Sequence, residues 1–413
     1  MAGDSPERDR GKRLLVLGAG PAQLGLLAAA RTRELHVIAV DRDPSAPGFR
    51  YADRRAIVST EDESGIERLA SAERVDGLIA PGIDWPVAIC ARVAGRLGLP
   101  HPISPETAAL STSKLRQRER FAEAGVQQPA YEICSGPREA AQAAERIGFP
   151  CVIKAPDRQG QRGLTLVHGA SEVAEAVRVA LDASRTATLL VEEHVPGREV
   201  TVNAFSSEGH FFPLTVTDRL TASPPAFGVA LTHVWPSELE PGEIGAAVEA
   251  AAAAAAAVRI EHGPSYTQVL VGPQGARVGE LAARLGGGHD AELCRAALGV
   301  DLNGAALSAA LGEDVSAAAL APVARVGGAC VRFLVPPAGE LRMVAGVEEA
   351  FALEGIRGIR IYRRPGHRFG EFRRGADRAG AILAVGDSRE EVLERAARAE
   401  GMIRFETDVE ALV

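Results

Sequence analysis

Short apolar runs and longer amphipathic stretches alternate along the first hundred residues. The runs RLLVL at 13–17 and HVIAV at 36–40 are bounded by polar residues or glycine, as buried strands are. Amphipathic, helix-like stretches follow at about 21–32, 64–72 and 86–97. Because strands that alternate with helices indicate parallel βαβ units, we expect an α/β region with a doubly wound parallel sheet at the start of the chain.

The pattern changes at the proline-rich segment LPHPISP, residues 99–105, which predicts a domain boundary. Beyond it strands and helices alternate less regularly, and residues 327–385 are rich in strand-like runs. We expect four parts in chain order: a disordered leader (1–12), a Rossmann-like domain (13–104), a two-lobed central domain (105–312, with a mobile lobe at about 128–190) and a β-rich domain (313–413) packed on it.

Composition narrows the class of protein. The 413 residues carry a formal net charge of −8, so neither nucleic acid nor an anionic membrane is an expected partner. The five cysteines are dispersed without a CxxC pair, which indicates buried thiols in a reducing cytoplasm. The leader lacks the apolar core of a signal peptide, and the alanine-dominated stretch 245–258 is too weakly hydrophobic to span a bilayer. We expect a soluble, cytoplasmic protein; the sequence leaves its assembly open, and a homodimer would be unsurprising.

A polar, glycine-containing loop lies between two apolar runs within residues 149–167. The first run ends in a lone cation, Lys154, and the loop carries Gly160, Gln161 and Gly163. Glycine lets backbone N–H groups approach an anion, and a nearby lysine neutralises a phosphate as a point charge. Taken alone, the segment fits an ordinary hairpin with a solvated loop better.

Two further segments place charges where they suit a nucleotide. Lys114 opens a helix ahead of the loop and would add a second cation for a triphosphate, although most lysines are simply solvated. Glu192, Glu193 and Glu199 lie at and beyond a strand end, where backbone groups suit a base and a carboxylate suits ribose hydroxyls. The alternative is a turn with solvated glutamates.

The segment YTQVLVGPQGARVGELAARLGGGHD, residues 266–290, predicts a hairpin whose second strand ends near Glu280, with Arg284 four residues later. Such a carboxylate would hold Mg²⁺ against a triphosphate, and such an arginine would stabilise a phosphoryl group in transfer. The following glycines would let backbone amides approach a second anion. A lone glutamate and arginine this close would otherwise form a surface ion pair.

The turn GAGPAQLG at 18–25, with Asp41 closing the next strand, approximates a dinucleotide-binding fingerprint. Its last glycine comes two positions later than that fingerprint allows, so the signal for NAD is weak. A turn needed only for tight strand-to-helix packing explains the segment equally well. An NAD(P)-dependent oxidoreductase stays an alternative, and it leaves Lys154, Glu280 and Arg284 unexplained.

The order of these motifs resembles the ATP-grasp superfamily, at the level of carboxylate–amine ligases and biotin-carboxylase-like enzymes, over nearly the whole chain. Lys114 precedes Lys154 with its glycine loop, the glutamates of 192–199 follow, and Glu280-x-x-x-Arg284 comes last. GELAARLGGGHD and the tail GIRGIRIYRRPGHRF with AGAILAVGDSREEV look most like the L-amino-acid ligases, which make dipeptides. The implied fold is an ATP-grasp architecture: a doubly wound leading domain, a two-lobed nucleotide-gripping domain and a β-rich C-terminal domain.

The resemblance implies ATP and Mg²⁺, or Mn²⁺, as cofactors and a role for each motif residue. For Arg360, one of a basic cluster, a solvated strand face is at least as good an explanation. The implied roles are phosphate binding by Lys114, Lys154, Gly160, Gln161 and Gly163; adenine contacts by Glu192, Glu193 and Val195; ribose binding by Glu199; metal binding by Glu280 and Gln268; catalysis by Arg284, His233 and Lys154; and substrate binding by Gly286, Gly287, Gly288 and Arg360.

Two positions depart from the family pattern. The strand before Glu280 usually carries a second metal-binding glutamate, where this chain has Gln268, and Ala282 replaces a frequent asparagine. An amide oxygen still ligates Mg²⁺ but adds no charge, so the set implies either one ion held tightly and a second held weakly, or a less demanding metal arrangement.

The implied reaction is ATP-dependent ligation of a small carboxylate, such as an amino acid, to an amine through an acyl phosphate. The alternatives are an ATP-dependent carboxylase acting on bicarbonate and a nucleotide-binding protein with weakened catalysis. We expect loops at about 217–232 and 335–364 to shape the substrate pockets.

Overall fold

The computed structural model describes residues 11–158 and 160–408, so nearly all of the leader expected at 1–12 lies outside the described residues. The N-terminal region contains β1 (Arg13–Leu17), α1 (Leu24–Thr32), β2 (His36–Val40), β3 (Arg54–Ala56), α2 (Glu63–Glu73), β4 (Gly77–Ile79) and α3 (Trp85–Leu97). Its strands form a parallel sheet in the order β3-β2-β1-β4, as the alternation of strands and helices predicted. β1 and β2 are buried along nearly their whole length, which explains their almost continuous apolar sequences.

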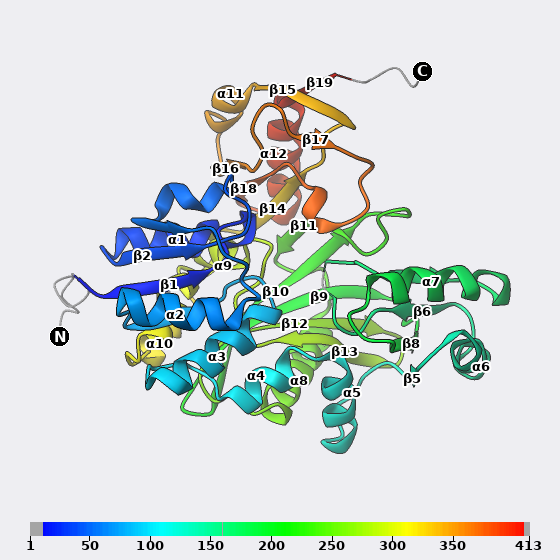
Figure 1. Cartoon of the computed structure of the whole chain (residues 1–413). Coiled ribbons are helices and arrows are strands. Elements are labelled where there is room, and N and C mark those ends of the chain that lie inside the picture. Colours follow the sequence, from blue (N-terminus) through cyan, green and yellow to red (C-terminus); the bar gives the residue numbers. More distant parts are fainter. Residues whose placement is uncertain (1–10, 159, 409–413) are drawn as a thin grey trace.

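A small lobe follows the first region and lies at the other end of the molecule (Figure 1). The chain reaches it through α4 (Pro105–Ser111) and α5 (Lys114–Glu123), and the lobe itself contains β5 (Tyr131–Cys134), α6 (Pro137–Ile147), β6 (Cys151–Lys154), β7 (Leu164–Val167), α7 (Val173–Ala183) and β8 (Leu189–Glu193). The strands form an antiparallel sheet in the order β5-β8-β6-β7. Alanine and valine side chains of α6 and α7 pack against this sheet. The β6–β7 hairpin therefore holds the glycine loop at the edge of the lobe.

A long antiparallel sheet forms the centre of the molecule and continues into the C-terminal region. Its strand order is β13-β12-β9-β10-β11-β14-β18-β16. The elements before residue 313 are β9 (Arg198–Ser207), β10 (His210–Thr221), β11 (Ala230–Trp235), α8 (Pro241–Ala257), β12 (Gly263–Gly272), β13 (Gly275–Ala282), α9 (Asp290–Leu298) and α10 (Leu302–Ala310). Those after it are β14 (Gly328–Leu334), β15 (Gly339–Ala345), α11 (Val347–Phe351), β16 (Ile356–Ile361), β17 (Arg368–Phe369), β18 (Gly380–Gly386), α12 (Arg389–Met402) and β19 (Arg404–Asp408).

The β-rich C-terminal region thus extends the central sheet, since β14 pairs with β11 and carries β18 and β16 beyond it. A second, small sheet has the order β17-β15-β19. The two segments expected to be loops are partly regular structure. Residues 217–221 belong to β10, whose hydrogen-bonded ladder with β9 and β11 continues there, and 335–364 contains β15, α11 and β16.

The N-terminal and central regions share one hydrophobic core, because α9 and α10 pack between their sheets. This core joins Leu14 and Leu27 of the parallel sheet region to Leu293, Leu307 and Phe333. All five cysteines are buried and unpaired, as expected for structural thiols. None of the helices in the described ranges is long and apolar enough to cross a bilayer.

Candidate active site

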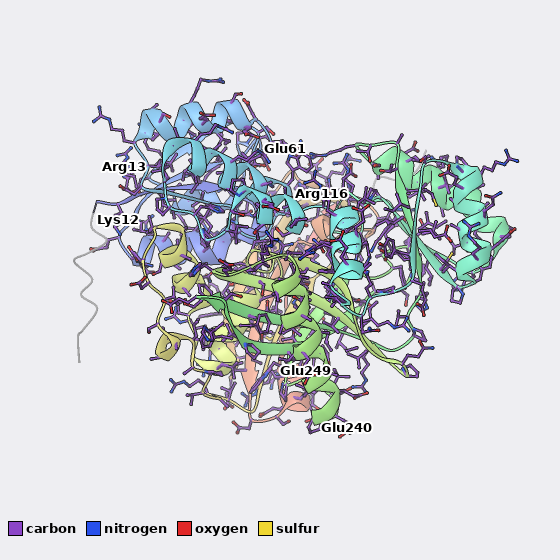
Figure 2. All side chains as sticks on the ribbon, turned by 90° about the horizontal axis from the view of Figure 1, so that it is seen from below. Lys12, Arg13, Glu61, Arg116, Glu240 and Glu249 are labelled. Carbon is purple, nitrogen blue, oxygen red and sulfur yellow. The ribbon has the colours of Figure 1, made fainter. Side chains whose placement is uncertain are left out.

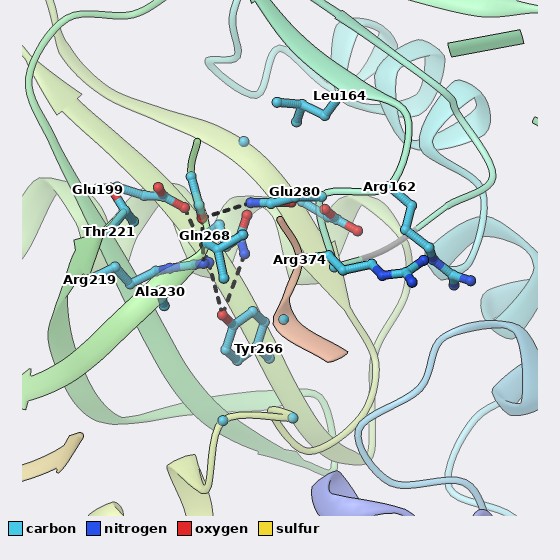
Figure 3. Close-up of a pocket in the computed structure, with 18 of the residues that line it drawn as sticks. Arg162, Leu164, Glu199, Arg219, Thr221, Ala230, Tyr266, Gln268, Glu280 and Arg374 are labelled. Atoms are coloured by element: carbon cyan, nitrogen blue, oxygen red, sulfur yellow. Dashed lines mark hydrogen bonds and ion pairs between the residues drawn. The ribbon is translucent and has the colours of Figure 1, made fainter. Parts of the chain in front are cut away.

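A cavity of about 1180 Å³ lies where the N-terminal region, the small lobe and the central sheet meet. Its walls come from the turns after β1 and β4, from β6 and β8 of the small lobe, and from β12, β13 and the chain leading into β18. Figure 3 shows one wall, where Glu199, Arg219, Tyr266 and Gln268 face one another and Glu280 lies beside them. Residues that are far apart in the sequence therefore line one space.

Lys154, at the end of β6, belongs to a buried group of three charged side chains. Its Nζ lies 2.6 Å from Oε2 of Glu192, which β8 places diagonally across the sheet. Arg118, from α5, donates from Nε to the other oxygen, Oε1, at 2.8 Å. All three residues are buried, so Glu192 compensates two cations at once.

The electrostatics of this group favour the ionised form of Glu192. Burial on its own would raise the pKa of Glu192, but Arg118 and Lys154 lower it to about 2. Burial lowers the pKa of Lys154; Glu192 opposes this shift, and Arg118 adds to it. A phosphate entering here would therefore share Lys154 with a carboxylate that is already in place.

Lys114 forms a second ion pair on the same cavity, with a residue of the central sheet. It is the first residue of α5, after the capping hydroxyl of Ser113, and its Nζ lies 2.7 Å from Oε1 of Glu280. Its Nζ also donates to the carbonyl of Arg158 in the glycine loop at 2.8 Å. Burial alone would lower the pKa of Lys114, but Glu280 and then Asp84 raise it above its ordinary value. Burial would likewise raise the pKa of Glu280, yet Lys114 holds it below its usual range.

The predicted metal ligands lie side by side. Gln268 of β12 is paired directly with Glu280 of β13, and both line the cavity. The Gln268 amide nitrogen donates to the Tyr266 hydroxyl at 3.4 Å, which leaves its amide oxygen available to a cation. In the part of the chain that the structure describes, no group of three or more His, Cys, Asp or Glu side chains is arranged to hold a metal. One carboxylate and one amide oxygen fit a Mg²⁺ whose other ligands are phosphate oxygens and water.

The lysine count is a signal that motif analysis missed. The chain has three lysines (Lys12, Lys114 and Lys154), and the remaining 43 of its 46 basic residues are arginines. Two of the three line this cavity, whereas Lys12 lies at the far edge of the N-terminal region, where it pairs with Glu313 (Figure 2). A lysine offers a compact point charge where an arginine offers a planar fork, so these two lysines differ in kind from the arginines around them.

The glycine loop, described at residues 155–158 and 160–163, borders the cavity. Gln161 donates from Nε2 to the carbonyl of Gly228, at the other side of the opening, at 2.8 Å. Gly160, Gln161 and Gly163 have φ values of +68°, +65° and +70°, in the left-handed region. A Cβ at Gly163 would lie 2.6 Å from the Cβ of Ala183, so this turn requires glycine.

The residues expected near a base and ribose line the same cavity, with two qualifications. The backbone N–H of Glu193 donates to the carbonyl of Ala130 at 2.8 Å, and its side chain pairs with Arg277 at 2.6 Å. This N–H is therefore already used, and a base would rely on other backbone groups, such as those of Val195. Glu199 is paired with Arg219 at 3.1 Å, a partner that sequence analysis missed.

Arg284 lies on the N-terminal side of the cavity. Its Nη2 is 2.5 Å from Oδ1 of Asp84, in the turn after β4, and its guanidinium lies 5.5 Å from the centre of the Tyr266 ring. Burial would lower the pKa of Arg284, but Asp84 raises it. No local motif marked Asp84, because the two residues meet only across the interface between the N-terminal region and the central sheet.

His233, on β11, is held by a buried carboxylate. Its Nδ1 lies 3.0 Å from Oδ1 of Asp290, and the backbone N–H of Gly288 donates to Oδ2 at 3.0 Å. Burial would raise the pKa of Asp290, but His233 and the Gly288 N–H lower it to about 2. A Cβ at Gly288 would lie 2.4 Å from Cε1 of His233, so the glycine lets the loop approach the imidazole.

Two residues predicted to bind substrate do not line this cavity. Arg360 is directed from β16 to Glu292, at 3.1 Å, and lines a separate cavity of about 800 Å³. Of the three glycines, Gly287 and Gly288 border the main cavity and Gly286 does not. Arg363 of the same basic cluster does line the main cavity, and so does Arg378, which the sequence pattern did not single out.

The glycine turn after β1 also borders the cavity, but its centre is filled. Gln23 lies so close that a Cβ on Gly18 would be 2.8 Å from its side chain, and its Nε2 donates to the carbonyl of Pro81 at 2.6 Å. Asp41 accepts the backbone N–H of Ala19 at 2.9 Å. The turn is therefore closed by the protein itself, which disfavours a dinucleotide pyrophosphate at this position.

Two family models match parts of this chain. Residues 112–220 match the family model for the ATP-grasp (A) domain of phosphoribosylglycinamide synthetase, and residues 332–408 match L-amino acid ligase C-terminal domain 2. An uncharacterized protein of Sinorhizobium fredii, y4rH, is 26% identical over 403 residues, covering 93% of this chain and 80% of that protein.

Solved structures share the whole architecture. An L-amino acid ligase from Bacillus licheniformis superimposes with a TM-score of 0.82 at 19% identity, covering 97% of this chain and 100% of that one. The biotin carboxylase domain dimer of the Hydrogenobacter thermophilus 2-oxoglutarate carboxylase, in complex with MgADP, ADP and bicarbonate, gives 0.79 at 17% identity, covering 96% and 91%. At these identities the likeness establishes the fold.

Proposed function

This chain belongs to the ATP-grasp superfamily, whose members bind ATP with Mg²⁺, and we propose that it is a carboxylate–amine ligase acting on an amino acid or a similar small carboxylate. Membership confirms the resemblance inferred from the order of the motifs. The observation that carries the proposal is the meeting of Lys114, Lys154, Glu280 and Arg284 on one cavity, although they span 171 positions of the sequence.

The proposed reaction has two steps. An oxygen of the donor carboxylate attacks the γ-phosphorus of ATP, the bond to the β–γ bridging oxygen breaks, and an acyl phosphate and ADP result. The amine nitrogen then attacks the acyl carbon, inorganic phosphate leaves, and the amine gives up a proton. A carboxylate needs this activation because it is a poor electrophile, whereas phosphate is a good leaving group.

Charges that are fixed before the substrates arrive would supply most of the rate enhancement. Lys114 and Lys154 would neutralise the phosphates, and Arg284 would stabilise charge on the phosphoryl group in transfer. Glu280, with the Gln268 amide oxygen, would hold the Mg²⁺ that accompanies the nucleotide and screens its phosphate charge. His233, oriented by Asp290, would accept the proton that the amine loses.

The small lobe would protect the intermediate. The glycine loop is tied to the cavity rim through Lys114 and through Gln161. Closure of this loop over bound phosphates would exclude water, which otherwise hydrolyses an acyl phosphate.

The proposal is tested by incubating the protein with ATP and Mg²⁺, adding pools of amino acids, and following ADP release and amide formation. We expect ADP release that depends on an amino acid and equals the amide formed. ATP binding without ADP release in any mixture would reject the ligase and favour the nucleotide-binding alternative. ADP release that depends on bicarbonate alone would favour the carboxylase.

A further inference from the structure

Arg378 lines the large cavity, on the chain leading into β18. Its guanidinium carbon is 3.7 Å from the centre of the Phe333 ring, and Nη2 donates to the carbonyl of Ala230 at 2.5 Å. The side chain is half-buried, because one side of it borders the cavity. Stacking and one hydrogen bond therefore fix the plane of this guanidinium before any ligand enters.

Among the described residues, no carboxylate accompanies this arginine as a counter-ion. Arg118, Arg219 and Arg284, which line or adjoin the same cavity, are each paired with a carboxylate. Within residues 11–158 and 160–408, no acidic side chain forms an ion pair with Arg378, and its buried Nε has no hydrogen-bond partner. A buried donor without a partner is costly, and it marks a position that a ligand completes.

The groups around Arg378 do not supply its counter-charge, so a ligand would have to supply it. Burial lowers its pKa to about 10, with Tyr362 opposing that shift and Arg219 adding to it, so the side chain is charged at neutral pH. The acidic residue that acts on it electrostatically, Asp290, is already bound to His233 and to the Gly288 N–H. A planar guanidinium with a free Nε matches a carboxylate, which accepts two parallel N–H bonds.

Phe333 links this site to the proposed proton acceptor. Its ring is stacked under Arg378 and contacts His233 edge-on, with ring centres 5.7 Å apart. A substrate that places a carboxylate on Arg378 would therefore hold its other groups beside His233. In the proposed reaction the donor carboxylate is consumed at the phosphate end, whereas a carboxylate on the amine substrate survives into the product.

We propose that Arg378 binds the free carboxylate of the amine substrate and thereby selects amines that carry one. The proposal rests on the ligase function. It makes Arg378 a binding and specificity residue, and it separates the site of the retained carboxylate from that of the reacting one.

The test compares three forms of an accepted amine substrate: the amino acid, its carboxamide and its decarboxylated amine. With the wild-type chain we expect kcat/KM to fall about 10- to 100-fold when the carboxylate is removed, with KM for ATP unchanged. Arg378→Gln should raise KM for the amino acid by a similar factor, abolish the preference over the carboxamide, and leave ATP binding intact. The matched control is Arg374→Gln, an exposed arginine on the same cavity that is already paired with Asp377 at 3.1 Å.

The role given to Arg378 is wrong if the Arg378→Gln variant keeps the wild-type KM for the amino acid and still prefers the amino acid over its carboxamide. The substrate comparison needs no variant, so it decides the matter even if Arg378→Gln fails to fold: equal use of the amino acid and the decarboxylated amine rejects the proposal. If the wild-type chain binds ATP but none of the amines supports ADP release, the ligase function is rejected and this inference is rejected with it. The two failures are therefore distinguishable.

Discussion

The two ends of the cavity treat charge in opposite ways. At the lysine end, each cation already has a carboxylate: Lys114 pairs with Glu280, and Glu192 lies between Lys154 and Arg118. At the arginine end, Arg378 is fixed by an aromatic ring and a carbonyl, without an acidic partner among the described residues. The lysine end therefore carries its own counter-charge, whereas the arginine end relies on a ligand for its counter-charge.

This difference shows how one cavity can bind both a nucleotide triphosphate and a small substrate that is chosen for its carboxylate. A triphosphate brings enough charge to compete with internal carboxylates, and those carboxylates prevent the buried cations from destabilising the empty site. A small substrate brings a single carboxylate, so the residue that recognises it benefits from having no competitor. Four predictions test this division, in decreasing order of expected effect.

The largest effect should follow removal of the shared counter-ion. Glu192→Ala leaves Arg118 and Lys154 buried without compensation, and we expect a loss of about 3–5 kcal/mol in the free energy of unfolding, measured by urea denaturation. The control is Glu132→Ala, which breaks the more exposed pair with Arg146 in the same lobe and should cost at most about 1 kcal/mol. Equal losses in the two variants would contradict the role given to the buried group.

The next effect concerns rate. Arg284→Ala should lower kcat about 100- to 1000-fold, because a fixed positive charge beside the transferring phosphoryl group is lost. ATP affinity, measured by calorimetry, should change little, since the two lysines remain. A variant that loses ATP binding while keeping kcat would place Arg284 at the lysine end instead.

The third prediction uses the scarcity of lysine. Lys154→Arg and Lys114→Arg keep the charge but replace a compact ammonium by a planar fork, and we expect Kd for ATP to rise about tenfold or more, roughly 1.4 kcal/mol. Lys12→Arg, the remaining lysine of the chain, is the matched control and should leave Kd unchanged. Tight ATP binding by both cavity variants would show that only charge matters there.

The smallest effect should come from the metal ligands. Gln268→Glu adds a carboxylate directly opposite Glu280, and the half-saturating Mg²⁺ concentration for ADP release should fall about fivefold, roughly 1 kcal/mol. Without Mg²⁺ the two carboxylates repel, so the same variant should unfold at a lower temperature than the wild type. Gln274→Glu, in the turn of the same hairpin, is the control for added charge and should leave the Mg²⁺ requirement unchanged.

The sequence by itself determined the elements and most of the lysine end. Apolar periodicity predicted the parallel sheet and the hairpins, since burial on both faces of a strand requires continuous apolar residues. Lys114, Lys154 and Glu280 stood out because each lies at an element boundary beside a recognisable loop or strand, and motif order led to the superfamily. The metal position predicted at Gln268 lies opposite Glu280 in the structure, and its role stays a prediction.

Only the tertiary structure decided which charges meet. Arg118 differs from other arginines of a polar helix only in that α5 turns it toward Glu192, and Asp84 finds Arg284 across 200 positions of sequence. Arg360 was only one candidate from a basic cluster, and β16 directs it to Glu292, whereas Arg363 and Arg378 line the cavity. An ion pair depends on a few ångströms between side chains that long-range strand pairing brings together, and local patterns of hydrophobicity and charge do not encode that distance.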